Sequence, residues 1–252
     1  MTEPIRLAVW SGPRNISTAL MRSWENRPDC VVVDEPLYAA YLAGTGIDHP
    51  GREDVLAVGP TDWREAVGRL GEPLPAGVRV HYAKHMSHHL LPEMDTDWVL
   101  SFTTVLLIRD PTLVVASYVR SRASVEPADI GFRQQAALLD LLLANGQDPP
   151  VIDADDFLRH PRAYLTWWCY WLGLPFDDGM LSWPAGPRDT DGVWAPHWYA
   201  AVQASTGFGP WRPREVSLSE HDAGVAGACR PAYERLRARR VRLPAGSGSK
   251  QP

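Results

Sequence analysis

The chain contains the stretch Leu7-Ala8-Val9-Trp10-Ser11-Gly12-Pro13-Arg14-Asn15-Ile16-Ser17-Thr18-Ala19-Leu20-Met21. This pattern predicts a short apolar strand, a turn of small residues and a helix that begins near Ser17. The first backbone N–H groups of such a helix have no intrahelical acceptor, and the positive end of the helix dipole points toward the turn. Because Arg14, Ser17 and Thr18 add further donors, the turn is predicted to bind a phosphate group.

The same turn differs from the two common nucleotide-binding loops. It lacks the second glycine and the lysine of G-x-x-x-x-G-K-[ST], and it does not match G-x-G-x-x-G. Ordinary capping of the helix by Ser17 is an alternative interpretation of the hydroxyl at this position.

A second strand and helix carry similar chemistry. Thr104-Val105-Leu106-Leu107-Ile108 is apolar enough for the middle of a parallel sheet, and Arg109-Asp110-Pro111 follows it. Pro111 suits the first turn of a helix that Asp110 caps. Since Ser117 lies about two turns into that helix, we expect Arg109 and Ser117 to reach one phosphate from different elements.

Two anion sites at the ends of two strands resemble those of the sulfotransferase family. A third match is Pro150-Val151-Ile152-Asp153-Ala154-Asp155-Asp156-Phe157-Leu158-Arg159-His160-Pro161, with Leu172-Gly173-Leu174-Pro175 after it. It is similar to a strand, acidic turn, helix and Leu-Gly-Leu-Pro ending that such enzymes carry downstream. The resemblance covers about residues 5 to 176 and implies a P-loop-like three-layer α/β/α fold with a central parallel sheet.

The resemblance also implies a cofactor, 3′-phosphoadenosine 5′-phosphosulfate (PAPS), with 3′-phosphoadenosine 5′-phosphate (PAP) as product and no metal. Arg109 and Ser117 correspond to the pair that holds the 3′-phosphate. The 5′-phosphosulfate is expected on the first turn, at Gly12, Pro13, Arg14, Asn15, Ile16, Ser17 and Thr18.

The first turn departs from the cytosolic branch of the family. Arg14 stands in the place of a lysine, Ile16 in the place of a glycine, and Ser17-Thr18 supply the paired hydroxyls. The turn, with Asp34-Glu35-Pro36-Leu37-Tyr38 downstream, most resembles the sulfotransferase-like domains related to those fused to branched-chain aminotransferase homologues in plants. That resemblance does not identify the acceptor.

A carboxylate pair follows the next predicted strand, Val31-Val32-Val33. If this strand is a parallel neighbour of the first, Asp34 and Glu35 reach the same sheet edge as the phosphate turn. In the tyrosylprotein and bacterial branches of the family a glutamate in this place accepts the acceptor proton, which points to Glu35 as the base. One alternative is that Asp34 is the base. Another is that Asp34 or Glu35 has a structural role, either pairing with an arginine or capping a helix.

Lys84 and Lys250 are the only lysines among the 25 basic residues. Lys84 follows the strand-like run Val78–Ala83, where a compact ammonium in an arginine-rich chain suggests a catalytic role, such as stabilising charge on the leaving group. Coding bias that favours arginine is the alternative interpretation.

His85, His88 and His89 follow Lys84. Histidines three and four apart can share one helix face, so a metal site is conceivable. The segment lacks the glutamate of H-E-x-x-H, and no cysteine cluster supports a metal. The alternatives are one histidine that acts on substrate, with His85 nearest to Lys84, or ordinary hydrogen-bonded histidines.

Composition favours one domain over residues 1–252. The chain is 45% hydrophobic and holds 11 tryptophans, enough for one sizeable core. Alternating predicted strands and helices indicate an α/β fold with a parallel sheet covered on both faces.

We expect a core over about 5–176, a loop-rich cap and final helix over about 177–243, and a flexible tail over about 244–252. The expected strands are 5–11, 30–34, 78–84, 104–109 and 150–154, and the expected helices are 17–27, 37–43, 61–70, 88–94, 111–123, 131–145 and 161–172.

The net charge and the cysteines limit the classes of partner and the cellular compartment that we expect. The net charge of −5 argues against general nucleic-acid binding, although the final helix carries the basic run Arg235–Arg242. That run suits a solvated helix face or, alternatively, a contact with the cofactor or an acidic partner. The three cysteines are odd in number and have no paired spacing, so disulfides are not indicated, and we expect neither a signal peptide nor a membrane span. We expect a cytoplasmic protein that acts on a small molecule and not at a membrane; the sequence leaves the oligomeric state open.

These features together predict a PAPS-dependent sulfotransferase with Glu35, Lys84 and Arg14 as catalytic residues. Two other functions share the anion site. A P-loop-like small-molecule kinase would need a phosphate-binding lysine and a magnesium carboxylate, which the sequence does not supply in place. A non-catalytic nucleotide-binding module on the same fold would carry the same binding residues. Aromatic side chains at Trp194–Tyr199 and the loop 44–60 are candidates for the wall of an acceptor pocket.

Overall fold

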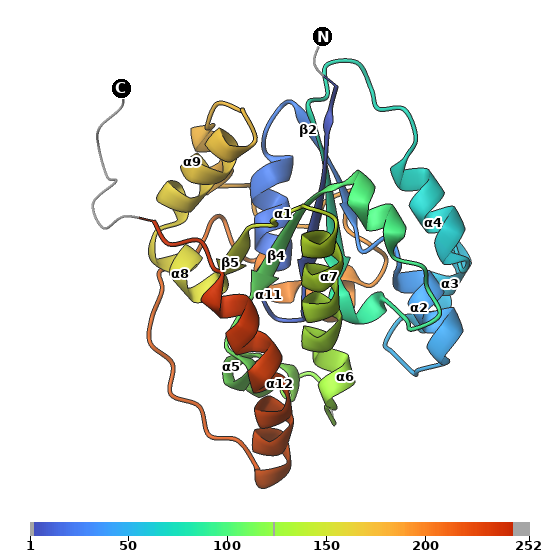
Figure 1. Ribbon diagram of the computed structural model, residues 1–252, viewed down its shortest axis with the longest axis vertical. Coiled ribbons are helices and arrows are strands. Elements are labelled where there is room, and N and C mark those ends of the chain that lie inside the picture. Colours follow the sequence, from blue (N-terminus) through green and yellow to red (C-terminus); the bar gives the residue numbers. More distant parts are fainter. Residues whose placement is uncertain (1–2, 123, 244–252) are drawn as a thin grey trace.

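The computed structural model describes residues 3–122 and 124–243. Its centre is a five-stranded sheet in which all paired strands are parallel (Figure 1), as the sequence predicts. The strand order is β2-β3-β1-β4-β5. The strands are β1 (Ile5–Ser11), β2 (Cys30–Asp34), β3 (Val80–Met86), β4 (Thr103–Ile108) and β5 (Val151–Asp153). The expected α/β fold is confirmed.

Alternate residues of the central strand pack into two different cores. Ala8 and Trp10 belong to one buried cluster, whereas Leu7 and Val9 belong to another. Successive side chains of a strand point to opposite faces of the sheet, so each face is covered by its own helices. Helices α4 (Trp63–Leu70), α5 (Pro111–Tyr118), α7 (Phe132–Ala144) and α12 (Glu220–Ala238) contribute to the first core, and α1 (Ser17–Glu25), α8 (Ala154–Arg159) and α9 (Pro161–Trp171) to the second. The expected three layers are therefore present.

Most expected helices lie within a few residues of their predicted bounds. Helix α2 (Tyr38–Thr45) is confirmed, and α5 ends at Tyr118 instead of 123. The expected helix over 88–94 is wrong, because only a 3₁₀ turn, η1 (Ser87–His89), forms there. Leu90 is already extended, with ψ of 104°, and Pro92 disfavours helical backbone at Leu91. The structure adds α3 (Arg52–Val58), α6 (Pro127–Ile130) and the 3₁₀ helix η2 (Asp97–Ser101).

Residues 177–219, called the cap below, contain little regular structure. They hold η3 (Asp178–Leu181), α10 (Ala195–Trp198) and α11 (Ala200–Gln203). The expectation of a loop-rich segment at this place is confirmed. The expected flexible tail over 244–252 lies outside the described residues.

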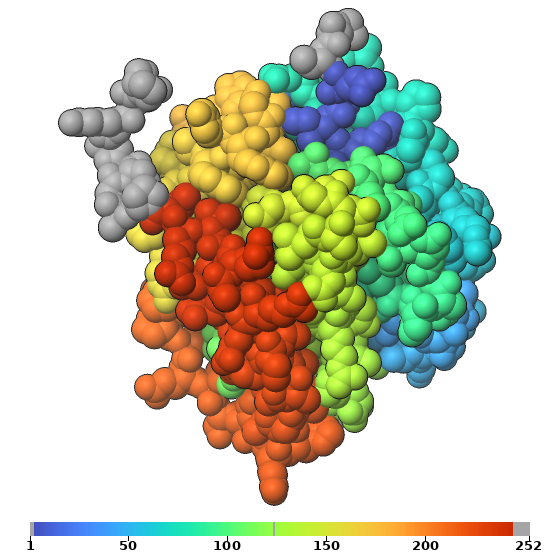
Figure 2. Space-filling model, in the orientation of Figure 1, coloured from blue at the N-terminus to red at the C-terminus, as the bar shows by residue number. Residues whose placement is uncertain are grey.

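Helix α12 spans Glu220–Ala238, so only the first part of the basic run Arg235–Arg242 lies in the expected final helix. Figure 2 shows α12 beside α7 on the same face of the molecule, and the two helices contact each other. Arg235 pairs with Asp140 of α7, while Arg239 and Arg240 pair with Asp148 and Asp156 at 2.7 and 2.9 Å. The basic run therefore joins acidic residues of the neighbouring elements in ion pairs. No helix in residues 3–122 or 124–243 is long and apolar enough to cross a membrane.

The order of the strands brings the predicted functional segments to one edge. Because the strands are parallel, the chain leaves β1, β2, β3, β4 and β5 at the same side of the sheet. Strand β1 lies at the centre, between β3 and β4. Binding clefts of open α/β sheets form at this carboxyl edge, where neighbouring strands send their connections in opposite directions.

Candidate functional site

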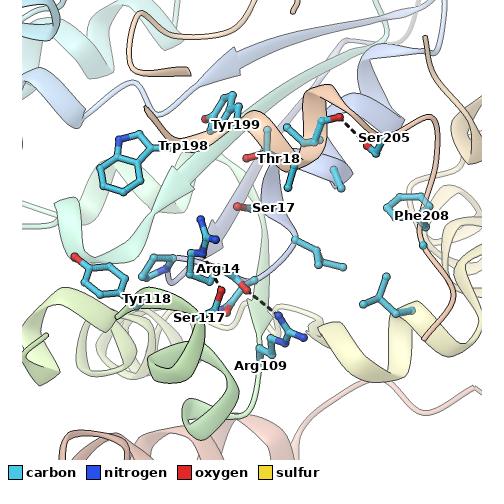
Figure 3. A pocket seen from close by; sticks show the side chains of 18 of the residues that line it. Arg14, Ser17, Thr18, Arg109, Ser117, Tyr118, Trp198, Tyr199, Ser205 and Phe208 are labelled. Atoms are coloured by element: carbon cyan, nitrogen blue, oxygen red, sulfur yellow. Dashed lines mark hydrogen bonds between the residues drawn. The ribbon is translucent and has the colours of Figure 1, made fainter. Parts of the chain in front are cut away.

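A cavity of about 680 Å³ lies at the carboxyl edge of the sheet. Figure 3 shows Arg14, Ser17 and Thr18 at its centre, with Trp198 and Tyr118 on one side and Phe208 on the other. Apart from Gly12, every residue that the sequence assigns to the site lines this cavity: Pro13, Arg14, Asn15, Ile16, Ser17, Thr18, Glu35, Lys84, Arg109 and Ser117.

The turn after β1 holds an unusual backbone. Arg14 has φ of 62° and Ile16 has φ of 60°, in the left-handed region that favours glycine. A β-branched residue there costs free energy, about 1–3 kcal/mol, and persists only where the surroundings enforce it. Glu35, with φ of 42°, is the only other non-glycine residue of the described chain with positive φ. All three line the same cavity, so the backbone strain is concentrated at the site.

Ile16 occupies the N-cap position of α1 and makes no side-chain cap. The alternative in which Ser17 caps the helix is therefore wrong, because Ser17 is the first residue of α1. Ser17 and Thr18, in the first turn of α1, line the cavity, and Figure 3 shows their side chains there. This arrangement leaves the donors available to an anion.

Two residues anchor the turn to the rest of the fold. Asn15, which is fully buried, donates from Nδ2 to the carbonyl of Leu107 at 3.4 Å. A Cβ on Gly12 would lie only 2.4 Å from the carbonyl oxygen of Ile130. Gly12 thus permits a close backbone approach and does not itself line the cavity.

The two predicted anion-binding elements meet directly. Arg14 donates from Nε to Oγ of Ser117 at 3.0 Å, and Arg109 donates from Nη1 to the carbonyl of Arg14 at 3.1 Å (Figure 3). Burial lowers the pKa of Arg109 and outweighs the opposing charge of Asp155, with Arg214 acting in the same direction as burial; burial and Arg120 lower the pKa of Arg14. Each guanidinium is thus partly desolvated beside another cation, which favours a bound anion.

Arg109 retains an unused donor. Its Nε atom is buried without a hydrogen-bond partner among the described residues. Asp155 Oδ1 forms an ion pair with this Nε atom at 3.5 Å, although the geometry is not that of a hydrogen bond. A buried donor in this state is costly unless a ligand uses it.

A buried acid–base cluster forms the wall next to the turn. Asp34 and Lys84 are opposite each other in the register of β2 and β3. Lys84 Nζ donates to Asp34 Oδ1 at 2.8 Å and to Glu35 Oε1 at 2.7 Å. The third contact of Nζ is Tyr199 Oη, so the three ammonium protons have three acceptors. Lys84 therefore faces the carboxylates. In this arrangement its ammonium has no free proton for the expected contact with the leaving group.

Burial raises the pKa of Glu35, the charge of Lys84 lowers it, and the charge of Asp34 raises it; the net direction is upward. Lys84 keeps a raised pKa because the attraction of Asp34 and Glu35 outweighs the cost of burying its charge. Lys84 is thus held as the ammonium. A carboxylate with a raised pKa is better matched to general-base catalysis than an ordinary one.

The histidines after Lys84 are buried, and they separate into two groups. His85 stacks on Trp10 at 4.1 Å and does not line the cavity, which corrects the expectation that it is the histidine of the cleft. His88, His89 and His49 do line it. Burial lowers the pKa of His88 to about 3 and that of His49 to about 4, so these rings are neutral at physiological pH. Residues 3–122 and 124–243 contain no group of three potential metal ligands.

Several residues that line the cavity were not predicted from the sequence. Arg212 and Arg214 come from the cap, where nothing in their spacing marked them. Tyr199 lies between α10 and α11, in the aromatic segment suggested for the pocket wall, but its contact with Lys84 depends on the path of the cap. Trp198 and His49 confirm that this segment and the loop 44–60 both reach the cavity.

Comparisons with known proteins agree with the fold. The family described as "Sulfotransferase domain" matches residues 5–240. Branched-chain-amino-acid aminotransferase-like proteins 1 and 2 of Arabidopsis thaliana are 37% and 35% identical over 229 and 231 residues, or 88% and 91% of this chain. The chain spans about two fifths of their length, with 40% and 41% of each relative covered.

Solved sulfotransferase structures are similar in fold at low identity. The sulfotransferase domain from the curacin biosynthetic pathway has a TM-score of 0.53 at 17% identity, covering 90% of this chain and 98% of that one. A sulfotransferase from Alicyclobacillus acidocaldarius has a TM-score of 0.52 at 14% identity, covering 94% and 96%.

Proposed function

The chain belongs to the sulfotransferase domain family, and we propose that it transfers a sulfuryl group from PAPS to a hydroxyl or amine of a small molecule. One observation carries this proposal: the anion-binding turn, the pair Arg109 and Ser117, and the carboxylate of Glu35 line a single cavity. A donor cofactor with two phosphate ends and an acceptor next to a base need this combination.

The residues of the cavity fit the proposed cofactor. The open first turn of α1, with Ser17 and Thr18, would hold the 5′-phosphosulfate, and Arg14 would lie beside it. Arg109, with its unused buried Nε donor, and Ser117 would hold the 3′-phosphate. When bound, the cofactor supplies the sulfuryl group and a phosphate leaving group.

The proposed mechanism is an in-line displacement. Glu35 accepts the proton of the acceptor, and Arg14 with the N-terminal amides of α1 stabilises negative charge on the sulfuryl and phosphate oxygens. The neutral rings of Tyr38, His88 and Trp198 line the cavity and support an acceptor site that excludes water.

A thermal-shift comparison of PAP, AMP, ADP and ATP tests the cofactor. A ligand that binds only the folded state raises the apparent stability by mass action, so PAP should raise Tm strongly and the other nucleotides little. A large shift with ATP and magnesium alone would instead support a kinase. Equal shifts with all four nucleotides would contradict selective recognition of the 3′-phosphate.

Transfer itself is tested with ³⁵S-labelled PAPS and a panel of small hydroxyl and amine compounds. Label that appears in an acceptor in the presence of the protein supports an enzyme. Tight PAP binding with no transfer and no release of label above background across the panel would favour a non-catalytic binding module.

A further inference from the structure

Lys84 lies at the centre of a saturated hydrogen-bond cluster. Its side chain is only 1% exposed, and its three acceptors come from two segments: Asp34 and Glu35 at the end of β2 and directly after it, and Tyr199 in the cap. An ammonium group has three protons and no acceptor capacity. Lys84 therefore fixes the relative positions of these three side chains.

Tyr199 and Asp34 are also fully used. The hydroxyl of Tyr199 donates to Asp34 Oδ2 at 2.7 Å and accepts from Trp194 Nε1 at 3.1 Å, in addition to Lys84. Asp34 Oδ2 also accepts from the backbone N–H of Gly192 at 3.3 Å. Both oxygens of Asp34 and the single hydroxyl proton of Tyr199 thus have partners within the cluster.

One carboxylate oxygen stands apart. Glu35 Oε1 accepts from Lys84, but Oε2 has no hydrogen-bond donor among the described residues, and Nε2 of His89 lies 4.0 Å from it. Glu35 lines the cavity, whereas Asp34 does not. The cluster of two carboxylates and one ammonium carries a net charge of −1, and the oxygen without a partner is the one available to a proton.

We propose that Asp34, Lys84 and Tyr199 are positioning residues that hold Glu35 by Oε1 and leave Oε2 as the proton acceptor, with the cap supplying one of the three. This inference rests on the proposed role of Glu35 as the base. It assigns the two adjacent carboxylates different tasks: Asp34 holds Lys84 and Tyr199, and Glu35 takes the proton. In the transfer, the acceptor O–H or N–H bond breaks, its proton goes to Oε2, and the acceptor atom bonds to sulfur as the bond from sulfur to the phosphate oxygen breaks.

The charges around Glu35 make the proposal measurable. Asp34 on β2, Lys84 on β3, Tyr199 in the cap, His89 of η1 and Tyr38 of α2 are the titratable groups that face it. Removing the charge of Asp34 should lower the pKa of Glu35, whereas removing that of Lys84 should raise it. The two replacements thus act in opposite directions.

The experiment is a ¹³C NMR titration of the Glu35 carboxyl group in the full chain, with Glu35→Gln to assign the signal. Asp34→Asn should move the Glu35 midpoint down by about 1–3 pH units, the range for a nearby charge. A midpoint unchanged from the wild type would overturn the cluster. Lys84→Met leaves two buried carboxylates without their cation and is expected to destabilise the fold, so it does not carry the test.

Tyr199→Phe tests the contribution of the cap. Loss of the hydroxyl leaves the charge of Asp34 less compensated, so the Glu35 midpoint should rise. Tyr164→Phe is the matched control, because Tyr164 is also buried and donates to the carbonyl of Val241 at 3.0 Å outside the cavity. Equal midpoints in the two variants would overturn the role of Tyr199. The titration needs no transfer, so its failure is distinct from failure of PAP to bind or of label to move.

Discussion

The guanidinium of Arg14 donates from Nε to Oγ of Ser117 at 3.0 Å, across 103 positions of sequence. Arg14 belongs to the turn after β1 and Ser117 to the helix after β4, and the two strands are neighbours. The contact joins the two segments that we assign to the two phosphate ends of one nucleotide. It therefore fixes the spacing of the proposed donor site before any ligand binds.

Replacing the proposed base should separate catalysis from binding. Glu35→Gln keeps the shape but cannot accept the proton, so kcat should fall about 10²- to 10⁴-fold, or roughly 3–5 kcal/mol of barrier. The Kd for PAP, measured by calorimetry, should change little. Glu65→Gln is the control, since Glu65 is exposed on α4. Normal turnover of the Glu35 variant would remove it from the mechanism.

Arg109→Ala should weaken the binding of PAP much more than the binding of AMP. Hydrogen bonds to a charged group contribute about 1.5–3 kcal/mol each, so a loss of roughly 10- to 100-fold in PAP affinity is expected. The ratio of the two Kd values, compared with that of the wild type, is the measurement. Arg69→Ala on the exposed face of α4 controls for loss of net charge. If the affinities for both nucleotides fell equally, Arg109 would not contact the 3′-phosphate.

Gly12→Ala should destabilise the fold. Its Cβ would lie 2.4 Å from the Ile130 carbonyl, so the turn or the Ile130 backbone must move, at a cost of about 1–3 kcal/mol. Denaturant unfolding measures the change. Gly68→Ala is the matched control: Gly68 lies in α4, a Cβ there would meet no atom within 4 Å, and the variant should be more stable by about 0.5–1 kcal/mol. A neutral Gly12→Ala would contradict the close approach.

The ion pair between Arg230 and Asp110 should make stability depend on pH. Arg230 donates to both oxygens of Asp110, at 2.7 and 3.1 Å. Burial raises the pKa of Asp110, but the hydrogen bonds from Arg230 and Thr112 outweigh it and the net direction is down. The stabilisation is therefore present above the ordinary pKa of 3.8 and lost as pH falls through the lower folded-state pKa.

Arg230→Met should accordingly cost about 0.5–1 kcal/mol at pH 7, because the pair is partly exposed. Urea unfolding at several pH values provides the comparison with the wild type. The difference in free energy of unfolding should shrink toward zero below the folded-state pKa. A difference that stayed constant down to about pH 2 would contradict the electrostatic origin.

The parts of the fold that rest on local patterns could be predicted from the sequence. The apolar strand of residues 103–108 and the cap of α5 by Asp110, which accepts from the Thr112 N–H at 2.8 Å, follow from short-range rules. The six-residue helix α8 was not expected, although Asp153 accepts from the N–H groups of Asp155 and Asp156. Short helices bury few residues, so periodicity does not reveal them.

All the residues that the sequence assigned to the site except Gly12 line the cavity, but their contacts were only partly predicted. Glu35 and Lys84 were both expected at the same sheet edge, but their 2.7 Å contact depends on the register of β2 and β3. Tyr199 reaches Lys84 from 115 positions away through a loop-rich cap. No helix or strand periodicity fixes the path of such a loop, and for that reason its contribution emerged only from the structure.

The left-handed backbone at Ile16 shows the same limit. The resemblance placed Ile16 where relatives carry glycine, and the structure shows φ of 60° there. An isoleucine gives no local signal for such a conformation, because this residue type disfavours it. The residue type at this position therefore could not indicate the geometry.

The central claim is that one nucleotide is held at both phosphate ends by the turn after β1 and by the segment after β4. A crystal structure with PAP measures this most directly. We expect the 5′-phosphate within hydrogen-bond distance of the Ser17 and Thr18 N–H groups, and the 3′-phosphate at Arg109 and Ser117. A nucleotide bound outside the cavity, or with its 3′-phosphate away from both of these side chains, would contradict the account.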